Sequence, residues 1–159
     1  MVGGKKDNKS YEDKISKGYE YFDVTADVGI NAYGESIEEA FENASIAMFN
    51  VMTNINTIEP KISKNIHIES EDIVSLLYDY LSELLFLSET ELIFFKEFKI
   101  SIKKIYKNKE TIFKLEGIIK GETIDWNKHE HGCEVKAVTF HLMDVKKEDL
   151  FKVKVVLDL

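Results

Sequence analysis

Residues 36–52 read SIEEAFENASIAMFNVM and decide how the rest of the chain is interpreted. Ser36 and Glu39 have the spacing of a capping box, in which the hydroxyl and the carboxylate accept hydrogen bonds from backbone N–H groups left open at a helix start. The apolar residues that follow recur every three or four positions and so form one stripe along the helix. The stripe consists of Ile37, Ala40, Phe41, Ala44, Ala47, Met48, Val51 and Met52. The stretch therefore predicts an amphipathic helix whose stripe lies in a hydrophobic core.

A second amphipathic helix is predicted farther along the chain, from a cap at Ser70 to about Leu87. Acidic residues near its start favour this assignment because they interact well with the positive end of a helix dipole. Its expected buried face consists of Ile73, Leu76, Leu77, Tyr80, Leu81, Leu84 and Leu85. Neither helix follows a glycine-rich phosphate loop, so neither is interpreted as a cofactor cradle.

Strands are predicted wherever apolar and polar residues alternate. The expected strands cover residues 19–24, 28–34, 62–69, 92–106, 111–124, 134–145 and 150–157. The order of elements lacks the strict alternation of a doubly wound parallel sheet. We therefore expect the α+β class, as a single domain over residues 19–159 with a curved, mostly antiparallel sheet packed against two amphipathic helices. Residues 1–18 are polar and are expected to form a flexible N-terminal tail.

The composition favours a compact cytoplasmic protein. The 159 residues are 44% hydrophobic, enough for one core, and the single cysteine, Cys133, excludes an intramolecular disulfide. No apolar run has the length of a signal-peptide core or a membrane span, so no membrane association is expected. The formal charge is −8, and all 21 basic residues are lysines. Because arginine supplies the planar fork that grips guanine and phosphate, we expect no sequence-specific nucleic acid binding.

Familiar catalytic motifs, such as G-x-S-x-G, C-x-x-C and H-E-x-x-H, are absent from the sequence. The protein is therefore not expected to be an enzyme, and no catalytic or cofactor-binding residue is assigned. His129, Glu130 and His131, close to Cys133, could supply zinc ligands, but their place in a loop favours hydrogen bonds within a turn. His129 is kept as a candidate for partner contact. Trp126, at a strand end, is interpreted as a packing lid rather than a binding platform.

Asp27 lies in the tight turn expected between the first two strands. In the last predicted strand every second residue is apolar and faces inward, which puts Asp158 on the opposite face, at the rim of the sheet. The carboxylate of Leu159 adds another anion. If these groups meet, Ca²⁺ or Mg²⁺ would neutralise them with the oxygen ligands that such ions prefer. An aspartate in a turn is also a common turn former, and the residues alone leave that alternative open.

Several segments resemble the archease family. Residues 25–30 (TADVGI) and 38–44 (EEAFENA) are similar to the opening of that family, and residues 77–85 (LYDYLSELL) to its second helix. Residues 134–141 (EVKAVTFH) and the terminal pair 158–159 match its signature strand and its acidic end. These segments follow in order from the first predicted strand to the last residue, which makes the resemblance specific.

The resemblance implies an accessory protein of tRNA splicing. Archeases help the GTP-dependent tRNA-splicing ligase of the RtcB type to turn over, by promoting guanylylation of its active-site histidine. The family's ligands for a calcium-like ion correspond to Asp27, Asp158 and Leu159, with Ca²⁺ as the preferred cofactor and Mg²⁺ or Mn²⁺ as alternatives. Asp23 and His129 are kept as candidates for a place near the ion or for contact with the ligase.

One position departs from the family pattern, and two other functions compete with the ligase activator. Val24 stands where the family commonly has histidine before Thr-Ala-Asp, so a polar neighbour of Asp27 is lost.

The first competing function is a chaperone-like modulator of RNA-processing proteins, which needs no metal. The second is a metal-dependent hydrolase using Asp23, Asp27 and His129, which is disfavoured because no nucleophile is defined.

Overall fold

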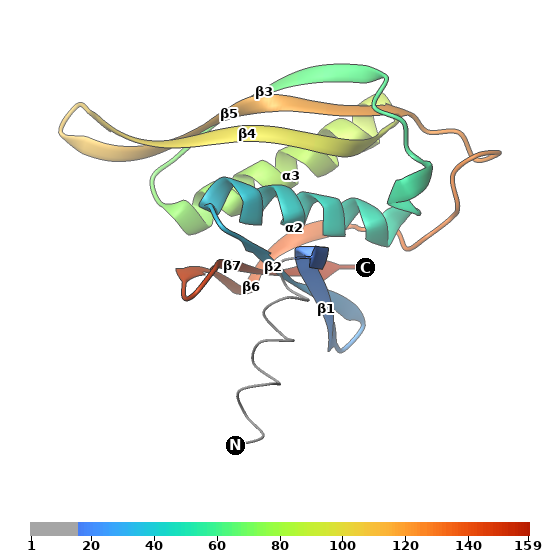
Figure 1. Cartoon of the computed structure of the whole chain (residues 1–159), viewed down its shortest axis with the longest axis horizontal. Coiled ribbons are helices and arrows are strands. Elements are labelled where there is room, and N and C mark those ends of the chain that lie inside the picture. The colour runs from blue at the N-terminus through green and yellow to red at the C-terminus, as the bar shows by residue number, and fades with distance from the viewer. Residues whose placement is uncertain (1–15) are drawn as a thin grey trace.

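Two helices lie between two β-sheets in the computed structural model, which describes residues 16–159 (Figure 1). Helix α2 spans Ile37–Met52 and helix α3 spans Ile73–Glu91. Each helix contacts strands of both sheets, so apolar side chains are packed on both sides of the helical layer. None of the described helices has the length and apolar character needed to cross a membrane.

Antiparallel pairing joins the described strands into a four-stranded sheet of order β1-β2-β7-β6 and a three-stranded sheet of order β3-β5-β4. A short 3-10 helix, η1, precedes β3. The elements other than α2 and α3 are β1 (Tyr19–Val24), β2 (Asp27–Gly34), η1 (Ile55–Thr57), β3 (Ile62–Ser70), β4 (Ile93–Lys107), β5 (Glu110–Thr123), β6 (Ala137–Lys147) and β7 (Phe151–Asp158).

The predicted α+β class is confirmed, but the strands form two sheets instead of the one curved sheet expected. The reason lies on α2, whose buried residues span roughly 200° of the helix circumference at 3.6 residues per turn. Those residues are Ala40, Phe41, Ala44, Ser45, Ala47, Met48 and Phe49. A surface that wide needs cover on two sides. Phe49, outside the predicted stripe, packs against Phe95 and Phe98 of β4 with ring centroids 5.7 and 5.8 Å away.

The two helix starts differ in how well they were predicted. Ser36 caps α2 as expected, because its Oγ accepts a 3.1 Å hydrogen bond from the backbone N–H of Glu39. The prediction that Ser70 caps α3 is wrong. Asp72 is the cap and accepts from the N–H of Ser75 at 2.7 Å. Ser70 is still paired in the ladder of β3 and β5, so it cannot adopt the position of a cap.

Residues 134–136, which were expected to begin a strand, belong to the loop before β6. Figure 1 shows this loop, residues 124–136, on the same side of the molecule as the C-terminus. Residues 1–15 lie outside the described residues, and so does most of the predicted N-terminal tail; its flexibility stays a prediction. Within residues 16–18, the carbonyl of Gly18 accepts a 2.7 Å hydrogen bond from the N–H of Tyr33 in β2.

Candidate cation site

Asp27 and Asp158 lie side by side at one end of the four-stranded sheet. Asp27 is the first residue of β2 and Asp158 the last of β7, and the antiparallel register places the two directly opposite each other. The backbone N–H of Leu159 donates a long hydrogen bond, 3.4 Å, to Oδ1 of Asp27. The fold therefore brings together the three residues that were predicted to bind a cation.

Both carboxylates belong to the face of the sheet that points away from the helices. Ile30 of β2 and Leu157 of β7 are fully buried in the core. Because side chains alternate along a strand, Asp27 and Asp158 lie on the opposite face from these two residues. Asp27 is partly buried and Asp158 is exposed. The pair is thus open to an ion or a partner that approaches the end of the sheet.

The chemistry of this pair suits a hard cation. Directly opposed residues on antiparallel strands have Cβ atoms about 4.5–5.5 Å apart, and like charges at that separation repel. Carboxylate oxygens are preferred ligands of Ca²⁺. Within residues 16–159, no three side chains from His, Cys, Asp and Glu are grouped so that they could hold a metal ion. A cation at Asp27 and Asp158 would therefore take further ligands from main-chain oxygens, such as those of Leu159, or from a partner.

The main chain at Asp158 is held by the loop that enters β6. The backbone N–H of Lys136 donates a 2.7 Å hydrogen bond to the carbonyl of Asp158, and Ala137 is the partner of Asp158 in the ladder of β6 and β7. Sequence reasoning missed this support, because no local pattern shows that residues next to a predicted strand will bond to the last residues of the chain.

Val24 and Asp23 lie on different faces of the sheet. In the ladder of β1 and β2, Val24 is directly opposite Asp27, whereas Asp23 is opposite Val28. Val24 therefore shares the face of the acidic pair, and Asp23 belongs to the other face. The position that departs from the family pattern is the one beside the pair. The register does not bring Asp23 to the place near the ion that was predicted for it.

His129 is buried in the loop between β5 and β6, at 2% exposure, and holds that loop in place. Its Nδ1 accepts a 3.0 Å hydrogen bond from the N–H of Asp125, so Nε2 carries the proton and donates to Oε1 of Glu122 at 2.7 Å. Burial alone would raise the pKa of Glu122, but hydrogen bonds from Lys128 and His129 outweigh it and lower that pKa to about 2. His129 thus has an internal role, and its burial argues against the predicted partner contact.

Comparison with known proteins gives a consistent set of relatives. The sequence model of the Archease protein family matches residues 19–159. Protein archease of Methanothermobacter thermautotrophicus is 51% identical over 144 residues, which cover 90% of this chain and 99% of that protein. Protein archease of Pyrococcus abyssi is 43% identical over 131 residues, covering 82% and 89%. Protein archease of Danio rerio is 37% identical over 145 residues, covering 91% and 87%.

Two solved structures share the fold. The solution structure of a Methanobacterium thermoautotrophicum protein is 49% identical, with a TM-score of 0.75, and the match covers 90% of this chain and 99% of that one. The crystal structure of a Thermotoga maritima archease, described as a possible chaperone, is 21% identical, with a TM-score of 0.52 and coverage of 87% and 94%. At that identity the second similarity concerns the fold alone.

Proposed function

Because the chain belongs to the archease family, we propose that it is an accessory protein that activates a GTP-dependent tRNA-splicing ligase of the RtcB type. In this role it promotes guanylylation of the ligase and its turnover, and it does not ligate RNA itself. The chain would interact with the ligase in the cytoplasm, where a reduced Cys133 is stable.

The observation that carries the proposal is the register of β2 and β7. It sets Asp27 directly opposite Asp158 on an outward face, with the N–H of Leu159 bonded to Asp27. Like charges that face each other across strands cost stability, so a fold that keeps them together is best explained by a cation that they share. Asp27, Asp158 and Leu159 would hold this ion, and Ca²⁺ fits their oxygen ligands, with Mg²⁺ and Mn²⁺ as alternatives.

A bound divalent cation would supply positive charge beside the phosphates of a nucleotide. The residues of this chain position that charge: the end of the four-stranded sheet presents the acidic pair outward, and Lys136 fixes the main chain of Asp158. The sheet is rigid compared with a loop, so the pair keeps its geometry when the ligase is bound.

Multiple-turnover RNA ligation by the ligase from the same source tests the proposal. We expect Asp27→Asn and Asp158→Asn to remove most of the stimulation, because each removes a charged ligand while leaving the shape of the side chain almost unchanged. Asp149→Asn is the matched control, since Asp149 is an exposed aspartate in the turn between β6 and β7, at the opposite end of β7 from Asp158. Stimulation by Asp27→Asn and Asp158→Asn at the level of the wild-type chain and of the control would rule the proposal out.

A second candidate function is that of a chaperone-like modulator of RNA-processing proteins, and individual exposed apolar side chains favour it. Phe86, Phe140 and Leu142 are each more than half exposed, at 57%, 56% and 52%, and Phe140 stacks on Tyr78 with ring centroids 3.9 Å apart. Such exposed apolar side chains can hold an unfolded chain. Suppression of the aggregation of unrelated proteins that persists in the presence of a chelator would support this function over the cation-dependent one.

A further inference from the structure

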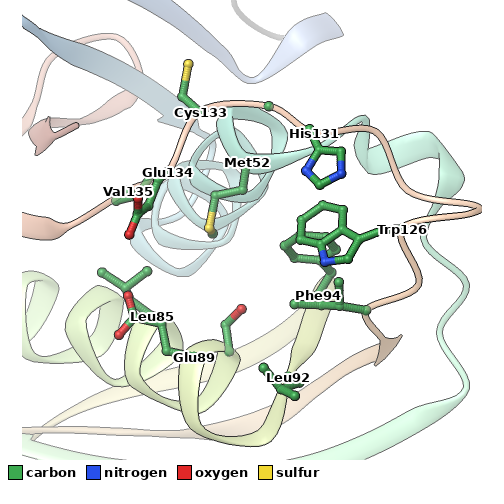
Figure 2. A pocket seen from close by; sticks show the side chains of 13 residues that line it. Met52, Leu85, Glu89, Leu92, Phe94, Trp126, His131, Cys133, Glu134 and Val135 are labelled. Carbon is green, nitrogen blue, oxygen red and sulfur yellow. The ribbon is translucent and has the colours of Figure 1, made fainter.

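A pocket of about 450 Å³ lies between the C-terminal ends of α2 and α3 and the loop that precedes β6 (Figure 2). Trp126, His131 and Phe94 line one end of this pocket, and Leu85, Glu134 and Val135 line the other. A cavity of this size that combines apolar walls with a few polar groups is typical of a binding site. Neither the family resemblance nor the cation site makes use of it.

Two carboxylates face this pocket without a cationic partner. Glu89 of α3 and Glu134 of the loop both line it and both are exposed. Among residues 16–159, no side chain forms an ion pair or a hydrogen bond with either carboxylate. The lining contains no lysine. The pocket therefore attracts a positive group and disfavours phosphate-bearing ligands.

An aromatic surface stands at the other end of the pocket. Trp126 is 52% exposed and stacks on His131, with ring centroids 4.0 Å apart and planes 10° apart. Phe94 meets the Trp126 ring edge-on at 5.7 Å. Trp126 thus packs against Phe94 and His131 and still offers an exposed surface, which the interpretation as a packing lid left out. An exposed aromatic ring attracts apolar and cationic groups, so this end of the pocket suits a second group of a ligand whose charged end lies beside Glu134 at the other end.

The pocket is formed before any ligand enters, because its loop is fastened to α2. The N–H groups of Gly132 and Cys133 donate 2.9 Å hydrogen bonds to the carbonyls of Met52 and Val51. A Cβ at position 132 would lie 2.4 Å from the Val51 carbonyl oxygen, so only glycine allows this close approach. The buried hydrogen bonds of His129 fix the same loop. Little conformational entropy is then lost on binding.

We propose that this pocket receives a basic side chain, lysine or arginine, from a protein partner. The aliphatic stem packs between Leu85, Met52 and Val135, and the charged end meets Glu89 and Glu134. The inference rests on the proposed function in one respect: the partner is the ligase that this chain activates.

A protein partner fits better than a free small cation because the pocket and the cation site are connected by consecutive residues of the chain. Val135 lines the pocket, the next residue, Lys136, bonds to the carbonyl of Asp158, and Ala137 pairs with Asp158. A protein that meets Asp27 and Asp158 therefore lies within a few residues of the pocket. The volume also exceeds that of one basic side chain, which leaves room for an apolar neighbour on the same segment.

The single tryptophan of the chain gives a direct measurement of occupancy. The full chain is labelled with 5-fluorotryptophan, and its one ¹⁹F resonance is followed while the unlabelled ligase from the same source is added. The variant Glu89→Gln/Glu134→Gln keeps the shape of the pocket and removes both charges. The matched control is Glu97→Gln/Glu110→Gln, because these glutamates of the hairpin formed by β4 and β5 are also exposed and lose the same charge.

We expect the ligase to shift the resonance of the wild-type chain and of the control, and to bind the pocket variant about tenfold more weakly or worse, as loss of charge-assisted hydrogen bonds requires. Equal affinity of the pocket variant and the control overturns the proposal. The proposal is also overturned if the ligase is stimulated but leaves the resonance unmoved. That result leaves the proposed function intact.

Titration with N-acetylarginine amide separates the remaining outcomes. A shift at millimolar concentration that disappears in the pocket variant supports recognition of a basic side chain. A ligase that is neither bound nor stimulated contradicts the proposed function, and the arginine amide titration then decides whether the pocket takes a basic group. The amide could instead bind at micromolar concentration while the ligase leaves the resonance unmoved. That result would identify a small-molecule site and overturn the proposal that the basic group comes from a protein.

Discussion

Asp27 and Asp158 face each other on neighbouring strands. At the residue scale, the proposed cation would therefore affect the stability of the folded chain. The two carboxylates repel when no ion is present, at a cost of up to about 1 kcal/mol for such a pair. An ion that binds only the folded chain raises its stability by about 2.7 kcal/mol at a hundred times its Kd, which corresponds to roughly 5–10 °C in Tm for a chain of this size.

We therefore expect CaCl₂ to raise the Tm of the wild-type chain by that amount in differential scanning calorimetry. Asp27→Asn and Asp158→Asn should lose most of the increase, and without calcium they should be as stable as the wild type or slightly more stable. Asp149→Asn should keep the full increase. A calcium-induced rise of the same size in both site variants would place the ion elsewhere.

Val24 offers a second prediction at this scale, because the register sets it directly opposite Asp27. Val24→His puts an imidazole beside the pair, and its protonation near pH 6.5 would place a positive charge next to the ion. We expect the calcium-induced rise in Tm of this variant to fall between pH 7.5 and pH 5.5, more than that of the wild type. Identical pH profiles for the two proteins would show that position 24 does not reach the site.

The positions of single site residues could be predicted from the sequence only in part. Asp158 could be placed on the outer face because apolar residues alternate along β7, and the family resemblance supplied its partners Asp27 and Leu159. Asp23 lies on the other face of the sheet because one position along a strand changes the face, so the register does not support a place near the ion, and its contact with the ligase stays a prediction. The burial of His129 could not be predicted, since its partner Glu122 comes from the end of β5 and the loop between them has no periodic pattern.

At the scale of elements, the loop between β5 and β6 depends on the ionised carboxylate of Glu122. Its pKa is lowered to about 2 in the folded chain, below the ordinary value of 4.5, so ionisation favours folding. The resulting stability is fully present above about pH 4.5 and is lost as the pH falls towards 2.

Glu122→Gln should therefore lower the free energy of unfolding at pH 7 by about 1–3 kcal/mol, because the donors Lys128 and His129 lose a charged acceptor. It should also flatten the decline of stability between pH 4.5 and pH 2. Urea unfolding across this range measures both effects, with Glu97→Gln as an exposed control. A variant whose acid profile matches the wild type would show that Glu122 does not hold the loop.

The helices were predicted more accurately than the arrangement of the sheets. The stripe of α2 and the cap at Ser36 are local features, and local features can be read from spacing. That the strands divide into two sheets depends on Phe49 and on the width of the buried surface of α2, which a single-stripe interpretation leaves out. The cap of α3 was misplaced because two neighbouring residues, Ser70 and Asp72, both suit a cap, and only strand pairing decides between them.

At the scale of the whole molecule, the formal charge of −8 bears on association with the ligase. A ligase that binds RNA presents basic surface, so long-range attraction should accelerate the encounter. We expect the association rate constant to fall at least about tenfold between 0.05 and 0.5 M NaCl, with a smaller change in the dissociation rate. Stopped-flow measurements test this, and an association rate that is independent of salt would contradict steering by charge.

The pocket and the acidic pair are linked by consecutive residues: Val135 lines the pocket, Lys136 bonds to the carbonyl of Asp158, and Ala137 is opposite Asp158 in the strand ladder. Under the two proposals above, the pocket would hold the partner and the end of the four-stranded sheet would present the ion. The two sites make separable contributions, because pocket variants should weaken binding while Asp27 and Asp158 variants should leave binding largely intact and reduce activation.

The most direct test is the rate at which the ligase from the same source becomes covalently guanylylated by radiolabelled GTP at saturating concentrations of this chain. The account predicts that the wild-type chain and Asp149→Asn accelerate guanylylation equally, and that Asp27→Asn and Asp158→Asn, shown to be folded and bound, do not accelerate it. Acceleration by the two site variants to the wild-type rate would contradict the account.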